Sequence, residues 1–354
     1  SYFLLSKMTG AAVRFYVVCI ILQKFVLDAL NIPFIITVIV MVGLIWLYTH
    51  RGGVKTLVWT DSFQTLCMFA ALILIIVNVA HSMNMGARDA VLAIISDSKS
   101  KIFIFNDWVS TQNFFKQFFS GIFIVIVMTG LDQDMMQKNL TCKTLKEAQK
   151  DMCTYGFAFI PANLLFLSLG ILLIMFASRQ GINIPVSGDD LLPMFAATGR
   201  LGDLVVVLFT IGIVAASFSS ADSSLTALTT SFCVDIKGKP EDERLRKTSH
   251  LIISVIFIIF ILLFKTINSK SMIDVIYILC SYTYGPLLGL FAFGLLTKYK
   301  VRDKMVPVVV LLSPLFCYII NIFSSRLWSY EFGYELLILN GLLTFMGLYL
   351  LKRK

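Results

Sequence analysis

The chain has 354 residues, of which 58% are hydrophobic and only 14% are charged. A soluble domain could not bury so large an apolar share, so the composition excludes a soluble globular protein and indicates a polytopic membrane protein. The net charge of +9 would suit a nucleic-acid-binding protein, but the charges lie mainly between apolar runs, where they orient a membrane chain.

The apolar runs predict ten membrane helices, because a span needs about 20 apolar residues. We expect an all-α polytopic membrane protein with a single transmembrane domain over residues 1–354. Residues 143–148 predict a short amphipathic helix outside the membrane. The ten predicted helices cover residues 12–30, 32–49, 56–80, 114–131, 152–178, 203–235, 246–267, 272–297, 305–323 and 334–351.

The distribution of the 30 Lys and Arg residues orients the chain. With the N-terminus inside, most of them, from Lys7 to the charged run 237–247, fall on the cytoplasmic side. The positive-inside rule then predicts a protein of the cytoplasmic (plasma or inner) membrane with both ends of this chain in the cytoplasm. The bilayer is the expected partner, and no nucleic acid is. Because the chain opens at Ser1 in an apolar sequence without an initiator Met, we expect the native chain to begin earlier.

The predicted helix 203–235 contains the most unusual stretch of the chain. Its polar residues recur at helical spacing and form one stripe: Ser219, Asp222, Ser223 and Thr226. An ionisable group deep in lipid costs at least ~2.5–3.5 kcal/mol, so Asp222 should face protein, water or an ion. Several side-chain oxygens around one carboxylate suit a hard cation such as Na⁺. A close helix–helix contact between small residues is the alternative.

A second acid, Asp61, lies in the predicted helix 56–80. Taken alone, this acid fits two interpretations equally: an acid favoured by the helix macrodipole, worth about 0.3–1 kcal/mol, or part of a functional site. In the predicted helix 272–297, Gly285 and Pro286 interrupt the hydrogen-bond ladder and predict a hinge or a kink. The scattered Cys and His residues have no metal-binding spacing, and no nucleophile–base pair is visible, so we expect no enzyme.

Four short motifs follow one another along the chain. They are Gly52-Gly53…Thr60-Asp61…Gln64, Asp132-Gln133…Gln137…Leu140, Ala216-Ser217-Phe218-Ser219-Ser220-Ala221-Asp222-Ser223 continuing to Asp235, and Gly285-Pro286…Gly289…Gly294. In this order, over about residues 1–300, they resemble the sodium:solute symporters. That family includes the sodium/glucose, proline, pantothenate and sialic acid carriers.

The resemblance implies a five-plus-five inverted-repeat transporter fold with broken first and sixth core helices. Residues 1–80 would be the remainder of the first repeat and residues 114–297 the second repeat. Residues 305–351 would form two peripheral helices. The first two core helices would then be missing from this chain.

The resemblance also implies the site residues. The main sodium site of the family uses an A-x-x-S-S pattern, here Ala216, Ser219 and Ser220. A second cation site would use Asp61, Asp222 and Ser223 together with Ser219. The solute would contact Val125, Met128, Thr129, Ile278, Ser281 and Tyr282. Residues 125–129 are apolar, which argues against a glucose-type site.

We therefore expect a secondary active transporter that performs sodium-coupled symport of a small solute by alternating access. Na⁺ would be the coupling ion, with no other cofactor. The alternative is a non-transporting sensor or scaffold protein with a symporter-like membrane domain, which would carry a signalling domain after the last helix. An intramembrane enzyme is a more distant alternative. The identity of the solute and the oligomeric state stay open.

Overall fold

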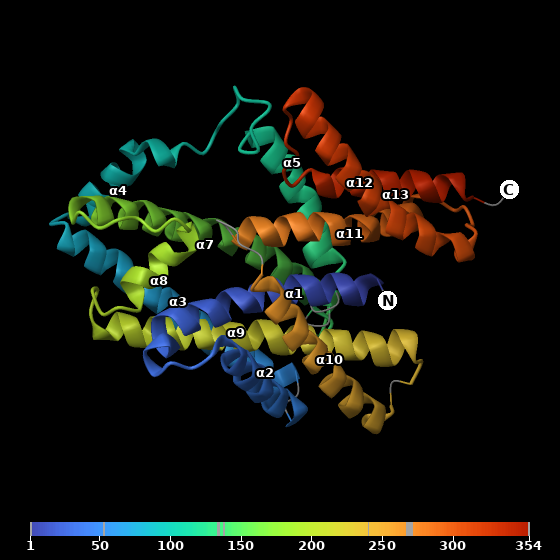
Figure 1. Cartoon of the computed structure of the whole chain (residues 1–354), viewed down its shortest axis with the longest axis horizontal. Coiled ribbons are helices and arrows are strands. Elements are labelled where there is room, and N and C mark those ends of the chain that lie inside the picture. The colour runs from blue at the N-terminus through green and yellow to red at the C-terminus, as the bar shows by residue number, and fades with distance from the viewer. Residues whose placement is uncertain are drawn as a thin grey trace. The chain divides into compact units, whose positions relative to one another are not determined.

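A computed structural model describes residues 2–51, 54–132, 135–136, 139–239, 241–266 and 272–352 (Figure 1). These residues are almost entirely helical. The long α-helices are α1 Tyr2–Leu22, α2 Phe34–Arg51, α3 Val54–Ser82, α5 Phe114–Val125, α7 Leu145–Arg179, α9 Asp203–Ser231, α10 Glu243–Phe264, α11 Met272–Leu296, α12 Val306–Trp328 and α13 Leu336–Leu350. Two short helices, α4 Ala87–Ser96 and α8 Leu191–Ala196, lie between them, and π-helical turns follow α1 (Gln23–Leu27), α5 (Ile126–Gly130) and α9 (Phe232–Ile236).

The membrane character predicted from composition is confirmed. Within the described residues, 7 helices are long and apolar enough to cross a membrane. The shorter apolar helices are Phe34–Leu47, Phe114–Gly130 and Leu336–Leu350. Together these elements correspond one to one with the ten predicted spans, and the protein is a multi-pass membrane protein.

Two predicted helix starts are wrong. α1 begins at Tyr2 rather than at residue 12, so Lys7 lies inside a helix. α7 begins at Leu145 rather than at residue 152. The Thr144 hydroxyl accepts a hydrogen bond from the Glu147 N–H at 3.2 Å, and the Glu147 carboxylate accepts one from the Lys143 N–H at 3.1 Å. This capping makes the predicted amphipathic helix 143–148 the first turn of α7.

The chain divides into two compact units, which are described separately. The larger unit comprises Ala11–Lys101 and Lys138–Met272. Its hydrophobic core lies where α3, α7, α8 and α9 meet and includes Ile75, Leu172 and Phe195, each at most 1% exposed. Both acids of the predicted cation sites, Asp61 on α3 and Asp222 on α9, belong to this unit.

The smaller unit comprises Ser1–Gly10, Ile102–Gln137 and Ile273–Lys354. It contains α5, α11, α12 and α13 (Figure 1). α11 continues through Gly285 and Pro286 without a break. A Cβ atom at Gly285 would stand 2.6 Å from Asn340 of α13, so the absence of a side chain permits a close contact between the two helices. Gly285 is thus a packing point between α11 and α13.

Candidate cation site

α3 and α9 pack against each other as an antiparallel pair. The Asn78 side-chain amide of α3 donates a hydrogen bond to the Leu201 carbonyl, just before α9 begins, at 2.8 Å. Further along, Met68 of α3 lies against Gly212, where a Cβ atom would stand 3.0 Å from the Met68 Cγ atom. Residue numbers therefore fall along α3 as they rise along α9, which sets the register between the helices.

This register brings the two predicted acid-bearing segments together. Asp61 precedes Met68 by two helical turns, and Ser219 follows Gly212 by two turns, about 10 Å along the axis in each case. Two full turns return a residue to the same helix face, so Asp61 and Ser219 lie at one level of the α3–α9 contact. Both are half-buried. Asp222 lies about one turn further along α9 and is only 1% exposed.

The polar stripe predicted on α9 faces the protein interior. Asp222 and Ser223 are buried, and Ser219 and Thr226 are half-buried. Ser220, on a neighbouring face, is exposed, and Ala216 is half-buried. The stripe therefore presents oxygen atoms toward the packed side of α9, whereas the A-x-x-S-S pattern extends from the packed side to the exposed side.

The hydroxyls of α9 fall into two groups by their hydrogen bonds. Ser217 donates to the Val214 carbonyl at 2.6 Å, and Ser224 donates to the Ser220 carbonyl at 2.8 Å. Ser223 also has a buried hydroxyl, but its Oγ atom has no hydrogen-bond partner among the described residues. Because buried polar atoms are nearly always hydrogen-bonded or bound to an ion, Ser223 is the better candidate ligand.

Gln64 also lies in this region, although from the sequence it was named only as part of a motif and not as a site residue. It lies one turn from Asp61 on the same side of α3 and is half-buried. Its side-chain nitrogen contacts the Met68 sulfur at 3.9 Å, and its buried Oε1 atom has no hydrogen-bond partner in the described part of the chain. An amide oxygen is a ligand that hard cations accept. Its spacing of three residues from Asp61, which puts both side chains on one helix face, is the sequence signal that could have identified it.

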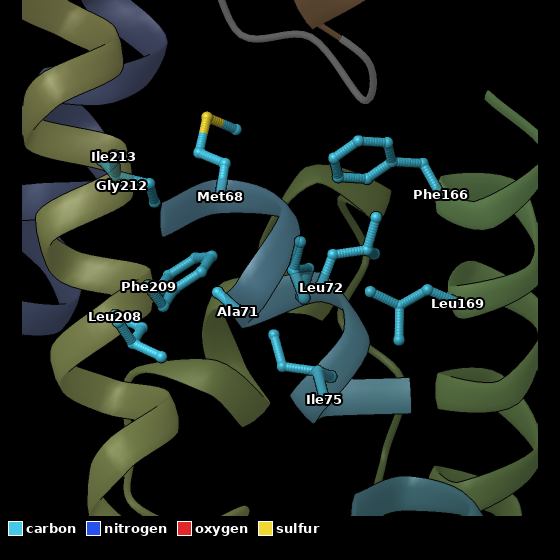
Figure 2. A pocket seen from close by; sticks show the side chains of 11 residues that line it. Met68, Ala71, Leu72, Ile75, Phe166, Leu169, Leu208, Phe209, Gly212 and Ile213 are labelled. Atoms are coloured by element: carbon cyan, nitrogen blue, oxygen red, sulfur yellow. The ribbon is translucent and has the colours of Figure 1, made fainter. Parts of the chain in front are cut away.

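Apolar packing bounds one end of this polar region. A cavity of about 50 Å³ begins at Met68 and extends along α3 away from Asp61. Figure 2 shows side chains of α3 and α9 facing those of α7 across it. It is lined by Met68, Ala71, Leu72, Ile75, Phe166, Leu169, Leu192, Leu208, Phe209, Gly212 and Ile213. Because every residue that lines it is apolar or glycine, the polar region ends near the contact between Met68 and Gly212.

The smaller unit contains a buried ion pair that the sequence did not predict. The Lys7 ammonium lies 2.8 Å from both carboxylate oxygens of Asp132, and the Tyr284 hydroxyl donates to the same carboxylate at 3.4 Å. These residues are 2%, 3% and 0% exposed, respectively. Lys7 is therefore buried, and the prediction that it is one of the cytoplasmic, solvent-exposed cations that orient the chain is wrong.

The predicted solute-lining residues lie in the same unit. Val125 and Ile278 are 62% and 40% exposed. Met128 and Thr129 are half-buried. Ser281 is buried, and the Tyr282 ring packs against Tyr318 of α12 with 6.3 Å between ring centroids. Four residues of the sequence motifs, Gly52, Gly53, Gln133 and Gln137, lie outside the described residues.

Comparison with known proteins identifies the family and the fold of this chain. Residues 6–302 match the profile of the sodium:solute symporter family. The sodium/sialic acid symporter of Proteus mirabilis is 24% identical over 313 residues, which cover 84% of this chain and 61% of that protein. The sodium/sialic acid symporter of Aliivibrio fischeri is 23% identical, over 84% of this chain and 60% of that protein. A solved Na⁺-coupled sialic acid symporter, substrate-bound and outward-open, matches with a TM-score of 0.77 at 18% identity, over 99% of this chain and 72% of that one.

The chain belongs to the sodium:solute symporter family, because the family profile covers most of its length. The structural match confirms the predicted transporter fold. The chain spans 60–61% of the length of the two bacterial relatives.

Proposed function

We propose that this chain is part of a symporter that couples Na⁺ movement to the transport of a small solute by alternating access. Family membership supports the general activity. The observation that carries the proposal is the placement of Asp61 and Ser219 at one level of the α3–α9 contact, next to the buried Asp222. Two carboxylates and several hydroxyls in one membrane-spanning helix pair offer the oxygen ligands that a hard cation such as Na⁺ takes.

The main sodium site is proposed at Ala216, Ser219 and Ser220. Hydroxyl and carbonyl oxygens suit Na⁺, and the exposed Ser220 leaves room for further oxygen ligands from outside the described helices. The second cation site is proposed at Asp61, Asp222 and Ser223, to which Gln64 adds an amide oxygen. An experimental structure with the Asp61 and Asp222 carboxyl groups more than ~10 Å apart, with no water path between them, would remove this shared site.

A cation at this place can drive a conformational change only by binding one state better than another. An ion held jointly by α3, α9 and further oxygen ligands does so, because it binds tightly only when these elements are close. Sodium binding thus favours one orientation of the transporter, and sodium release permits the other. This is the energetic requirement for coupling a sodium gradient to solute movement.

The proposed solute is a small organic acid, with sialic acid as the first candidate. Two relatives and the structural match are sialic acid symporters by name. Shorter matches are a sodium/iodide cotransporter, 28% identical over 103 residues, and a sodium-coupled monocarboxylate transporter, 27% identical over 103 residues. These names share an anionic solute. We place the protein in the cytoplasmic membrane with both ends of this chain inside.

The sodium site is tested by sodium titration of uptake. The complete protein is reconstituted into liposomes, and uptake of labelled sialic acid is measured against the Na⁺ concentration. Ser219→Ala and Ser220→Ala should each raise the half-saturating Na⁺ concentration about fivefold, the loss expected for one polar contact worth about 1 kcal/mol. Ser217→Ala is the matched control, because its hydroxyl already bonds to its own helix. Wild-type sodium dependence in both site variants would overturn the assignment.

A further inference from the structure

Pro286 leaves one backbone carbonyl of α11 without its helical partner. Proline has no N–H, so the Tyr282 carbonyl, four residues earlier, loses the donor that closes the helix turn. Inside a membrane, an unsatisfied backbone group costs several kcal/mol. The structure supplies a replacement: the Asn340 side-chain nitrogen of α13 donates to the Tyr282 carbonyl and to the Ser281 carbonyl, each at 3.0 Å.

The amide of Asn340 is held in this orientation by its other contacts. Asn340 is 0% exposed. The Ser313 hydroxyl of α12 lies 2.6 Å from its Oδ1 atom and 2.9 Å from its backbone carbonyl. Because the two α11 carbonyls can only accept, the NH₂ group must face α11 and the oxygen must face Ser313. The side chain therefore joins three helices through satisfied hydrogen bonds.

The backbone of α11 is shaped to admit this side chain. A Cβ atom at Gly285 would stand 2.6 Å from the Asn340 Cβ and Nδ2 atoms, and one at Gly289 would stand 2.5 Å from the Thr344 Cβ atom. Both glycines lie on the side of α11 that faces α13. Glycine at these positions lets α13 approach closely enough for the Asn340 amide to reach the carbonyls beside Pro286.

The same turn of α11 carries Tyr284, whose hydroxyl donates to Asp132 beside Lys7. We propose that Asn340 is a positioning residue of the transporter. Its amide replaces the N–H that Pro286 lacks and holds the turn 281–286 in the geometry that directs Tyr284 to the buried ion pair. The structural part of this proposal stands by itself, and its effect on transport rests on the proposed function.

A double-mutant cycle tests the structural part in the complete protein. Asn340→Leu removes both donors at similar side-chain volume, and Pro286→Ala restores the missing N–H. We expect Asn340→Leu to lower the thermal unfolding midpoint at least twice as much in the wild-type background as in the Pro286→Ala background. Ser313→Ala is the matched control, because it leaves both donors in place and should lower the midpoint equally in the two backgrounds. Equal effects of Asn340→Leu in both backgrounds would overturn the replacement of the N–H by Asn340.

Transport kinetics test positioning. In reconstituted protein, Asn340→Leu should reduce the maximal uptake rate several-fold. The half-saturating Na⁺ concentration should stay within about twofold of wild type, because Asn340 contacts α11 and α12 whereas the proposed sodium ligands lie on α3 and α9. The double variant Asn340→Leu with Pro286→Ala should recover at least half of the lost rate. A rate that stays low in the double variant while its stability recovers would overturn the positioning role. Absence of sodium-driven uptake in the wild-type protein, together with an effect of Asn340→Leu on stability that still depends on Pro286, would overturn the proposed function and leave the structural role of Asn340 standing.

Discussion

Breaking the buried pair of Lys7 and Asp132 should be among the most damaging single changes in the smaller unit. The ammonium lies 2.8 Å from both carboxylate oxygens, and both side chains are at most 5% exposed. Removing one partner of a buried pair costs about 3–5 kcal/mol, because the other charge stays in a low-dielectric environment. At about 2 °C per kcal/mol for a large domain, either single variant should lower the unfolding midpoint by roughly 6–10 °C.

The double variant separates the loss of the ion pair from the burial of a single charge. Each single variant removes the opposite charge that lies 2.8 Å from the remaining group, so we expect both to lower the unfolding midpoint. The double variant Lys7→Met with Asp132→Asn buries no charge at this place and should recover most of the loss.

Buried cysteines provide the assay. Cys280 and Cys317 are buried in the smaller unit, and the other five cysteines, Cys19, Cys67, Cys142, Cys153 and Cys233, belong to the larger unit. With those five replaced by Ala in every variant, a thiol-reactive dye reports unfolding of the smaller unit during heating in detergent. A variant of an exposed pair, Lys247→Gln on α10, is the control, because both side chains of the pair are exposed to solvent and such a pair contributes little. Midpoints of both single variants within about 2 °C of wild type would refute the reasoning, as would a double variant no more stable than the worse single one.

Two further changes test the α3–α9 register. Gly212→Leu should destabilise the larger unit by about 1–3 kcal/mol, because its side chain must displace Met68, whereas Gly212→Ala should cost less since the flexible Met68 side chain can shift. Thermal midpoints compare the two, and equal midpoints would contradict the close contact. Asn78→Ala should lower the free energy of unfolding by about 1 kcal/mol through loss of the hydrogen bond to the Leu201 carbonyl. The control is Asn163→Ala, since the exposed Asn163 amide donates to the Phe159 carbonyl of its own helix. An equal loss in both variants would contradict a specific tie between α3 and the start of α9.

Local sequence was sufficient to locate the membrane helices and the polar stripe. Hydrophobicity over about 20 residues is a property of one segment, so each span could be found without knowing its neighbours. The stripe of Ser219, Asp222 and Ser223 follows from helical periodicity alone. Two helix starts were predicted wrongly. α7 begins earlier because Thr144 caps it, and α1 begins earlier because the apolar residues before Lys7 are helical.

Only the tertiary structure decided which polar residues meet. Lys7 and Asp132 are separated by 125 positions, and a lysine near the start of a chain has the same local sequence whether it is solvated or buried. Gly285 and Pro286 predicted a hinge or a kink, because their local sequence does not contain the Asn340 amide, which donates to the Tyr282 carbonyl from another segment. The placement of Asp61 and Ser219 at one level of the α3–α9 contact depends on the register between the two helices, which the Met68–Gly212 contact sets. Periodicity determines which face of a helix is polar, and long-range packing determines what that face contacts.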